Sequence, residues 1–140
     1  MKIVFIIAFF FTALSIKAQR KQHILNNKTF LANVGSIWEE TPDENPCAGQ
    51  QVYLVLEFKE AKVLVVEKYI SSCEKEKIIV IGNYKWILLD NNRVKIVADL
   101  KEIEDTYFKK LILEFSNGQL LGTRINGNNS ISEFIFIDTL

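Results

Sequence analysis

Residues 51 to 69 read QVYLVLEFKEAKVLVVEKY, and this stretch decides the fold. Its first half, QVYLVLEF, carries an apolar side chain at every second position, which is the period of a half-buried strand. Its second half, KVLVVEKY, has the same character, and residues 59 to 61 predict a turn between them. The stretch therefore predicts a β-hairpin with one face toward a core. The side chains expected on that face are Val52, Leu54, Leu56, Phe58, Leu64 and Val66.

The two cysteines of the chain, Cys47 and Cys73, flank this hairpin. If the chain turns at residues 59 to 61, paired residue numbers sum to about 120, and Cys47 falls opposite Cys73 to within about one residue. Two cysteines that face each other at the open end of a hairpin lie within bridging distance. We therefore predict a disulfide between them, which is typical of an oxidising compartment.

Two other roles for these cysteines have less support. A nucleophilic cysteine needs a histidine base within hydrogen-bond reach. The only histidine, His23, lies close to Gln19, where we expect the mature chain to start after removal of a signal peptide. A structural zinc site needs four ligands, which two cysteines and one histidine do not supply. We therefore predict neither a catalytic thiol nor a metal site.

The rest of the chain has the pattern of further strands joined by short turns. One long apolar segment, residues 77 to 90, contains the pair Gly82–Asn83, which predicts a bulge, a bend or a turn that splits it in two. The pair Asn117–Gly118 between two strands is a strong hairpin signal. The other expected strands cover residues 29–38, 93–100, 107–115, 119–125 and 132–140.

This pattern predicts an all-β, single-domain antiparallel meander of about eight or nine strands. Sheet twist accumulates over so many strands, and closing the sheet removes its exposed edges. A small up-and-down barrel is therefore the expected architecture, with a two-sheet sandwich as the alternative. We expect the barrel domain over residues 29–140, after a polar lead-in over residues 19–28.

Residues 1–18 predict a signal peptide. Lys2 gives it a short positive start, an almost wholly apolar run follows from Ile3 to Ile16, and Ala18 suits cleavage before Gln19. The apolar run is shorter than the roughly 20 residues that a membrane-spanning helix needs. We therefore expect an exported protein, periplasmic or secreted, without a retained transmembrane segment.

Charge and motif content argue against several classes of function. The chain has 17 basic and 17 acidic side chains, so it lacks the basic excess that is typical of nucleic-acid-binding proteins. Its loop carboxylates, within residues 39–44 and 102–105, do not have the spacing of a calcium loop. The sequence contains no nucleophile elbow and no phosphate-binding glycine loop. We therefore expect neither an enzyme nor a bound cofactor.

Three stretches resemble a known family. They are GSIW at residues 35–38, GNYKWILLDNN at residues 82–92, and LLGTRI followed by ISEFIFI near the end of the chain. Together with the disulfide and the export signal, they resemble the small secreted lipocalin-like proteins of Bacteroidetes, which are calycin-type barrels. The lipocalin hallmark is Gly-x-Trp, whereas two residues separate Gly35 from Trp38 here. The resemblance implies a lipocalin-like barrel that binds a ligand or a partner.

Aromatic residues are the candidates for a ligand site. Tyr84 and Trp86 share one face of their expected strand, and Trp38 and Phe58 complete the set. An eight-stranded barrel is just wide enough either to be filled by side chains or to hold one small ligand. These aromatics are therefore expected either to fill the core or to line a binding cavity.

Two classes of function follow from this sequence. The first is an exported, non-catalytic, lipocalin-like protein that binds a small apolar or amphipathic ligand. The alternative is a periplasmic or envelope protein that inhibits or tethers a protein partner through its loops. For the alternative, the exposed loop from Thr41 to Gln50 is the expected contact surface.

Overall fold

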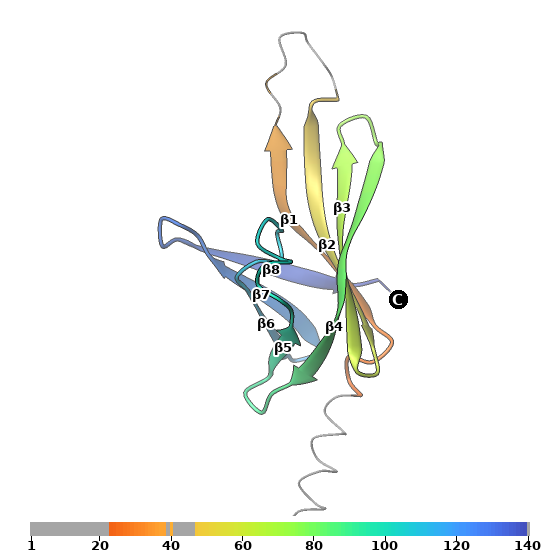
Figure 1. The fold of residues 1–140 in the computed structure, drawn as a ribbon, viewed down its shortest axis with the longest axis vertical. Coiled ribbons are helices and arrows are strands. Elements are labelled where there is room, and N and C mark those ends of the chain that lie inside the picture. Colours follow the sequence, from red (N-terminus) through yellow and green to blue (C-terminus); the bar gives the residue numbers. More distant parts are fainter. Residues whose placement is uncertain (1–22, 39, 41–46, 140) are drawn as a thin grey trace, which may run out of the picture.

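The computed structural model describes residues 23–38, 40 and 47–139, and Figure 1 shows their fold. Eight strands pair antiparallel in chain order, and the sheet closes between the first and the last into a barrel. The predicted all-β meander and its closure into a barrel are therefore confirmed. The strands are β1 (Thr29–Trp38), β2 (Gly49–Lys59), β3 (Lys62–Ser71), β4 (Glu76–Leu88), β5 (Arg93–Val97), β6 (Leu111–Ser116), β7 (Gln119–Ile125) and β8 (Ile131–Asp138).

The predicted signal peptide, residues 1–18, lies outside the described residues. Within the described part of the lead-in, residues 23–27 form a turn, and Leu25 is fully buried in the core of the barrel. In the ranges that the structure describes, no helix is long and apolar enough to cross a membrane.

The β2–β3 hairpin turns over two residues, Glu60 and Ala61, and not over the three expected. Lys59 pairs directly with Lys62, so paired residue numbers sum to 121. Side chains alternate between the two faces of a strand, so a shift of one residue exchanges the faces of β3 relative to β2.

The face of β3 that meets the core therefore differs from the expectation. Leu64 and Val66 lie on the outer face, so the prediction for these two residues is wrong. Val63 and Val65 take their place and are both fully buried. The same alternation carries Glu67 to the inner side of the barrel, where it is 3% exposed.

The pair Gly82–Asn83 directly follows a bulge in β4, and a bulge is one of the three outcomes expected. β4 continues through it as one strand, and the shift in its pairing with β3 leaves Ile81 as the extra residue. A Cβ at Gly82 would overlap the ring of Tyr84. The missing side chain at Gly82 therefore makes room for that ring, whose hydroxyl donates to the carbonyl of Ile81 at 3.3 Å.

The Cys47–Cys73 disulfide is confirmed, with its Cα atoms 5.1 Å apart. It closes the open end of the β2–β3 hairpin. The backbone N–H of Ser72 donates to the carbonyl oxygen of Gly49 at 2.8 Å, and the Ser72 hydroxyl donates to the same oxygen at 3.0 Å. Since 47 and 73 sum to 120 and the ladder sums to 121, the bridge lies one residue out of register, within the predicted margin.

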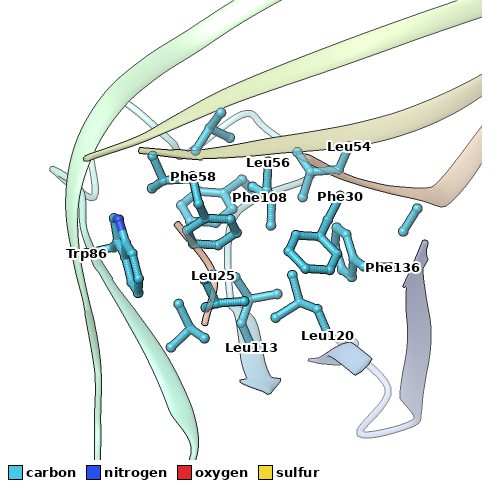
Figure 2. Close-up of a cluster of buried hydrophobic side chains, with 14 of the residues drawn as sticks. Leu25, Phe30, Leu54, Leu56, Phe58, Trp86, Phe108, Leu113, Leu120 and Phe136 are labelled. Atoms are coloured by element: carbon cyan, nitrogen blue, oxygen red, sulfur yellow. The ribbon is translucent and has the colours of Figure 1, made fainter. Parts of the chain in front are cut away.

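The inner faces of the strands pack into one hydrophobic core (Figure 2). Phe58 meets Trp86 edge to face with ring centroids 5.0 Å apart, and Phe30 meets Phe58 in the same manner at 5.9 Å. Aromatic rings favour this geometry because the positive edge of one faces the negative face of the other. The fully buried side chains are Trp86, Phe30, Phe58, Phe136, Leu25, Leu54, Leu56, Leu120, Val52, Val63 and Val65.

Two seams in the barrel wall are short. The ladder between β2 and β3 has ten residue pairs, whereas β1 with β8 and β5 with β6 each have two. Figure 1 shows the consequence at the first seam, where β8 diverges from β1 after a short contact. At the second seam, the connection of residues 98–110, here called the turn segment, bridges β5 and β6. The pairs are Phe30–Asp138 and Leu31–Ile137 at the first seam, and Arg93–Glu114 and Val94–Leu113 at the second.

Candidate functional site

Three of the four predicted ligand-binding residues lie in the core. Trp86 and Phe58 are 1% and 0% exposed and contact each other. Tyr84 shares the inner face of β4 with Trp86, as expected, and stacks on Phe108 with ring centroids 6.5 Å apart and planes 8° apart. These contacts agree with the core-filling role of the three residues, and their role in binding a ligand stays a prediction.

Trp38, the fourth predicted residue, is not brought together with the other three. It lies at the end of β1 and is 78% exposed. Its ring covers Gly49, where an added Cβ would lie 3.4 Å from the indole. Together with residues of β2 and β3 it lines a pocket of about 210 Å³. Trp38 therefore belongs to the rim of the barrel and not to its core.

A second pocket, here called the gap pocket, lies where β5 and β6 separate. Its volume is about 230 Å³. The strands supply part of its wall and the turn segment supplies the rest, because the β5–β6 ladder ends after two pairs. Eight apolar side chains and one lysine line it. These residues are Val94, Ile96, Ala98, Leu100, Ile103, Phe108, Lys110, Leu111 and Leu113.

The turn segment is a run of tight turns, and it carries two buried apolar side chains. The Asp99 carboxylate accepts from the N–H of Lys101 at 2.9 Å, and the Thr106 hydroxyl donates to the carbonyl of Ile103 at 2.8 Å. Such bonds between a side chain and the nearby backbone replace the ladder that a strand would provide. Ile103 and Phe108, each 6% exposed, hold the segment against the core.

Glu67 fixes the turn segment to β3. Its carboxylate accepts from the backbone N–H of Tyr107 and from the hydroxyl of Tyr69, both at 2.6 Å. Burial raises the pKa of Tyr69 above its usual range, and the hydrogen bond to Glu67 and the negative charge of that carboxylate raise it further. Glu67 is the only buried charged residue in the part of the chain that the structure describes. The hydrogen bonds from Tyr107 and Tyr69 offset the free-energy cost of burying the Glu67 carboxylate.

Glu67→Gln is expected to destabilise the fold by about 1–3 kcal/mol, because two donors then face an amide with one oxygen acceptor. Urea unfolding at neutral pH measures this loss. Glu133→Gln, an exposed carboxylate on β8, serves as the control and is expected to stay within about 0.5 kcal/mol of the unmodified protein. Equal stability of the two variants would show that Glu67 does not hold the turn segment.

Sequence reasoning missed the gap pocket. The predicted strand over residues 107–115 begins only at Leu111, because residues 107–110 belong to the turn segment. The available signal was the placement of Ile103 and Phe108 within a charged stretch, since isolated apolar residues in a loop often anchor it to a core. No feature of the local sequence pattern predicts that β5 and β6 separate.

Comparison of the chain with protein-family models, with curated proteins and with solved structures finds no match. Within residues 23–38, 40 and 47–139, no group of three or more His, Cys, Asp or Glu side chains could hold a metal ion. The proposal for function therefore rests on the geometry of the barrel and its pockets.

Proposed function

We propose that this chain is an exported, non-catalytic, lipocalin-like protein that binds a small apolar or amphipathic molecule in the gap pocket. The observation that carries the proposal is the set of side chains that line this pocket, which are apolar apart from one lysine. Ligand sites are concave and mostly apolar, with a few polar groups that fix orientation. An apolar protein cavity of about 150 Å³ accommodates benzene, so a pocket of about 230 Å³ suits a ligand with one or two rings.

The gap pocket adjoins the aromatic residues singled out from the sequence. Phe108 of its lining stacks on Tyr84. Ile96 of its lining pairs across the ladder with Trp86. A ligand in the gap pocket would therefore lie one side chain away from both predicted residues, and the fluorescence of Trp86 should respond to it.

Export is part of the same proposal. The Cys47–Cys73 disulfide supports it, because structural disulfides persist in oxidising compartments. A protein in the periplasm or medium meets small apolar molecules that need a carrier or a receptor. The proposed mature chain starts at Gln19.

Anilinonaphthalene sulfonate, a fluorescent probe of apolar sites, is expected to bind the protein and to lose at least about tenfold in affinity in Ala98→Phe. The new ring would occupy the gap pocket, which Ala98 lines. Val97→Phe is the matched control, because Val97 is the adjacent residue, is 57% exposed and lies on the other face of β5. Thermal unfolding of both variants checks that they fold. A folded Ala98→Phe protein that binds the probe as tightly as the unmodified protein would contradict the proposal.

The alternative function, binding of a protein partner, is favoured by a different observation. Two neighbouring apolar side chains on the outer face of β4, Ile78 and Val80, are 62% and 63% exposed. Exposed apolar groups in one patch mark interaction surfaces. If Ala98→Phe retained probe binding and Val80→Lys removed it, this outer surface would become the better candidate. Most of the loop expected as the contact surface, residues 41–46, lies outside the described residues.

A further inference from the structure

Arg124 lies on the inner face of β7; it is not part of the lining of the gap pocket but is the strand neighbour of a residue that is. It pairs across the ladder with Leu111, a residue of the pocket lining. Directly opposed residues of an antiparallel pair have Cβ atoms about 5 Å apart. Its guanidinium carbon lies 4.8 Å from the centroid of the Phe134 ring and 5.8 Å from that of Tyr107. A permanent positive charge is thus held between two aromatic rings at the side of an apolar pocket.

The guanidinium of Arg124 has no acceptor for part of its donor edge. Its Nε and Nη2 atoms are buried without a hydrogen-bond partner. The ion pairs found among the described residues all use lysine. Burial lowers the pKa of Arg124, since desolvation disfavours the charged form. The two rings offset part of this cost through cation–π attraction, but a ring face does not supply the in-plane acceptor that the donor edge requires.

Carboxylates of the turn segment and of β3 already have other interactions. Glu104 pairs with Lys109 at 3.6 Å, and Asp99 accepts the N–H of Lys101. Glu102 faces the hydroxyl of Tyr84, whose pKa is raised first by burial and then by the charge of Glu102. Glu67 accepts from Tyr107 and Tyr69. None of these four carboxylates therefore accepts a hydrogen bond from Nε or Nη2 of Arg124 in this structure.

We infer that the ligand of the gap pocket is an amphipathic acid, whose carboxylate is bound by Arg124 while its apolar part enters the pocket. This inference rests on the proposed function. The Nε–Nη2 edge of arginine presents two parallel N–H groups, which match the two oxygens of a carboxylate. Lys110, in the pocket lining, adds a second positive charge to the site.

Tyr107 is the group that must move for a carboxylate to reach Arg124. It belongs to the turn segment and not to a strand, so its ring can turn away while β7 keeps its place. Glu67 binds only the backbone N–H of Tyr107, so this hydrogen bond does not restrain the ring. The ring packs against Gly35, where an added Cβ would lie only 2.8 Å from the ring carbon Cε1. The absence of a side chain at Gly35 of β1 therefore leaves room for the Tyr107 ring.

The test compares two probes that differ in charge, naphthoate and naphthalenemethanol, by calorimetric titration at neutral pH. The unmodified protein is expected to bind naphthoate more tightly. Arg124→Gln should weaken naphthoate about tenfold to a hundredfold and leave naphthalenemethanol unchanged, because one charge-assisted bidentate contact is lost. Arg93→Gln is the matched control, since Arg93 is exposed on β5 and is expected to change neither affinity.

The outcomes separate this inference from the proposed function. Equal binding of both probes, unaffected by Arg124→Gln, would overturn the inference while the proposed function stands. Failure of both probes to bind would overturn the two together. The midpoint of urea unfolding provides a second measurement, because removal of a half-buried charge whose Nε and Nη2 atoms have no acceptor should not lower stability. If Arg124→Gln loses naphthoate binding only because the protein unfolds, the role of Arg124 is structural and the inference is also contradicted.

Discussion

Trp86→Ala is expected to lower the free energy of unfolding by about 3–5 kcal/mol, which is the usual cost of removing a buried aromatic ring. The ring is 1% exposed and packs edge to face on Phe58. Its Nε1–H donates to the carbonyl oxygen of Lys59 at 3.1 Å. The truncation therefore creates a cavity in the core and removes one hydrogen-bond donor from the carbonyl group of Lys59. Urea unfolding followed by circular dichroism measures the loss.

The second tryptophan of the chain provides the control. Trp38 is 78% exposed, so Trp38→Ala is expected to change stability by no more than about 0.5 kcal/mol. The two variants, Trp86→Ala and Trp38→Ala, also distinguish the fluorescence emission of the buried indole from that of the exposed indole. If the two variants lost equal stability, the placement of Trp86 in the core would be wrong.

Loss of the disulfide is expected to cost about 3–4 kcal/mol on the chain-entropy model. Cys47 and Cys73 are separated by 26 positions, and the bond restricts the unfolded chain over that loop. The Cys47→Ala/Cys73→Ala double variant should still fold, because the β2–β3 ladder and the core are independent of the bond. Its urea midpoint, compared with that of the unmodified, disulfide-bonded protein, gives the loss.

A reducing agent offers an independent check on the disulfide. It should shift the urea midpoint of the unmodified protein toward that of the double variant, and it should leave the double variant unchanged. An unmodified protein that keeps its midpoint under strong reductant, with both thiols shown to be free, would mean that the bond adds no stability.

The gap pocket connects these structural effects to binding. The same break in the β5–β6 ladder that creates the pocket also leaves the turn segment to be held by Ile103, Phe108 and the carboxylate of Glu67. Variants at Glu67 should therefore affect both stability and the binding of naphthoate, whereas variants at Arg124 should affect binding alone. This difference distinguishes the residue that positions the segment from the residue that contacts the ligand.

The sequence by itself determined the local elements and their succession. A period of two in apolar residues indicated the strands, and Asn117 and Gly118, both with positive φ, form the predicted tight turn. The two cysteines meet because the residue numbers of paired positions in a hairpin add to a constant, and 47 and 73 come close to that constant. These features depend on neighbours along the chain or on one hairpin, so a local pattern is sufficient to predict them.

Only the tertiary structure decided which side chains face inward on β3 and where the barrel wall opens. A turn shorter by one residue placed Val63 and Val65 inside in place of Leu64 and Val66, since register is set by the closure of the turn and a single-residue shift reverses every side chain. Residues 67 and 107 meet across forty positions, and the pairing of Arg124 with Leu111 places a charge beside the gap pocket. Such contacts depend on how strands separate and close in space, which no single stretch of the sequence encodes.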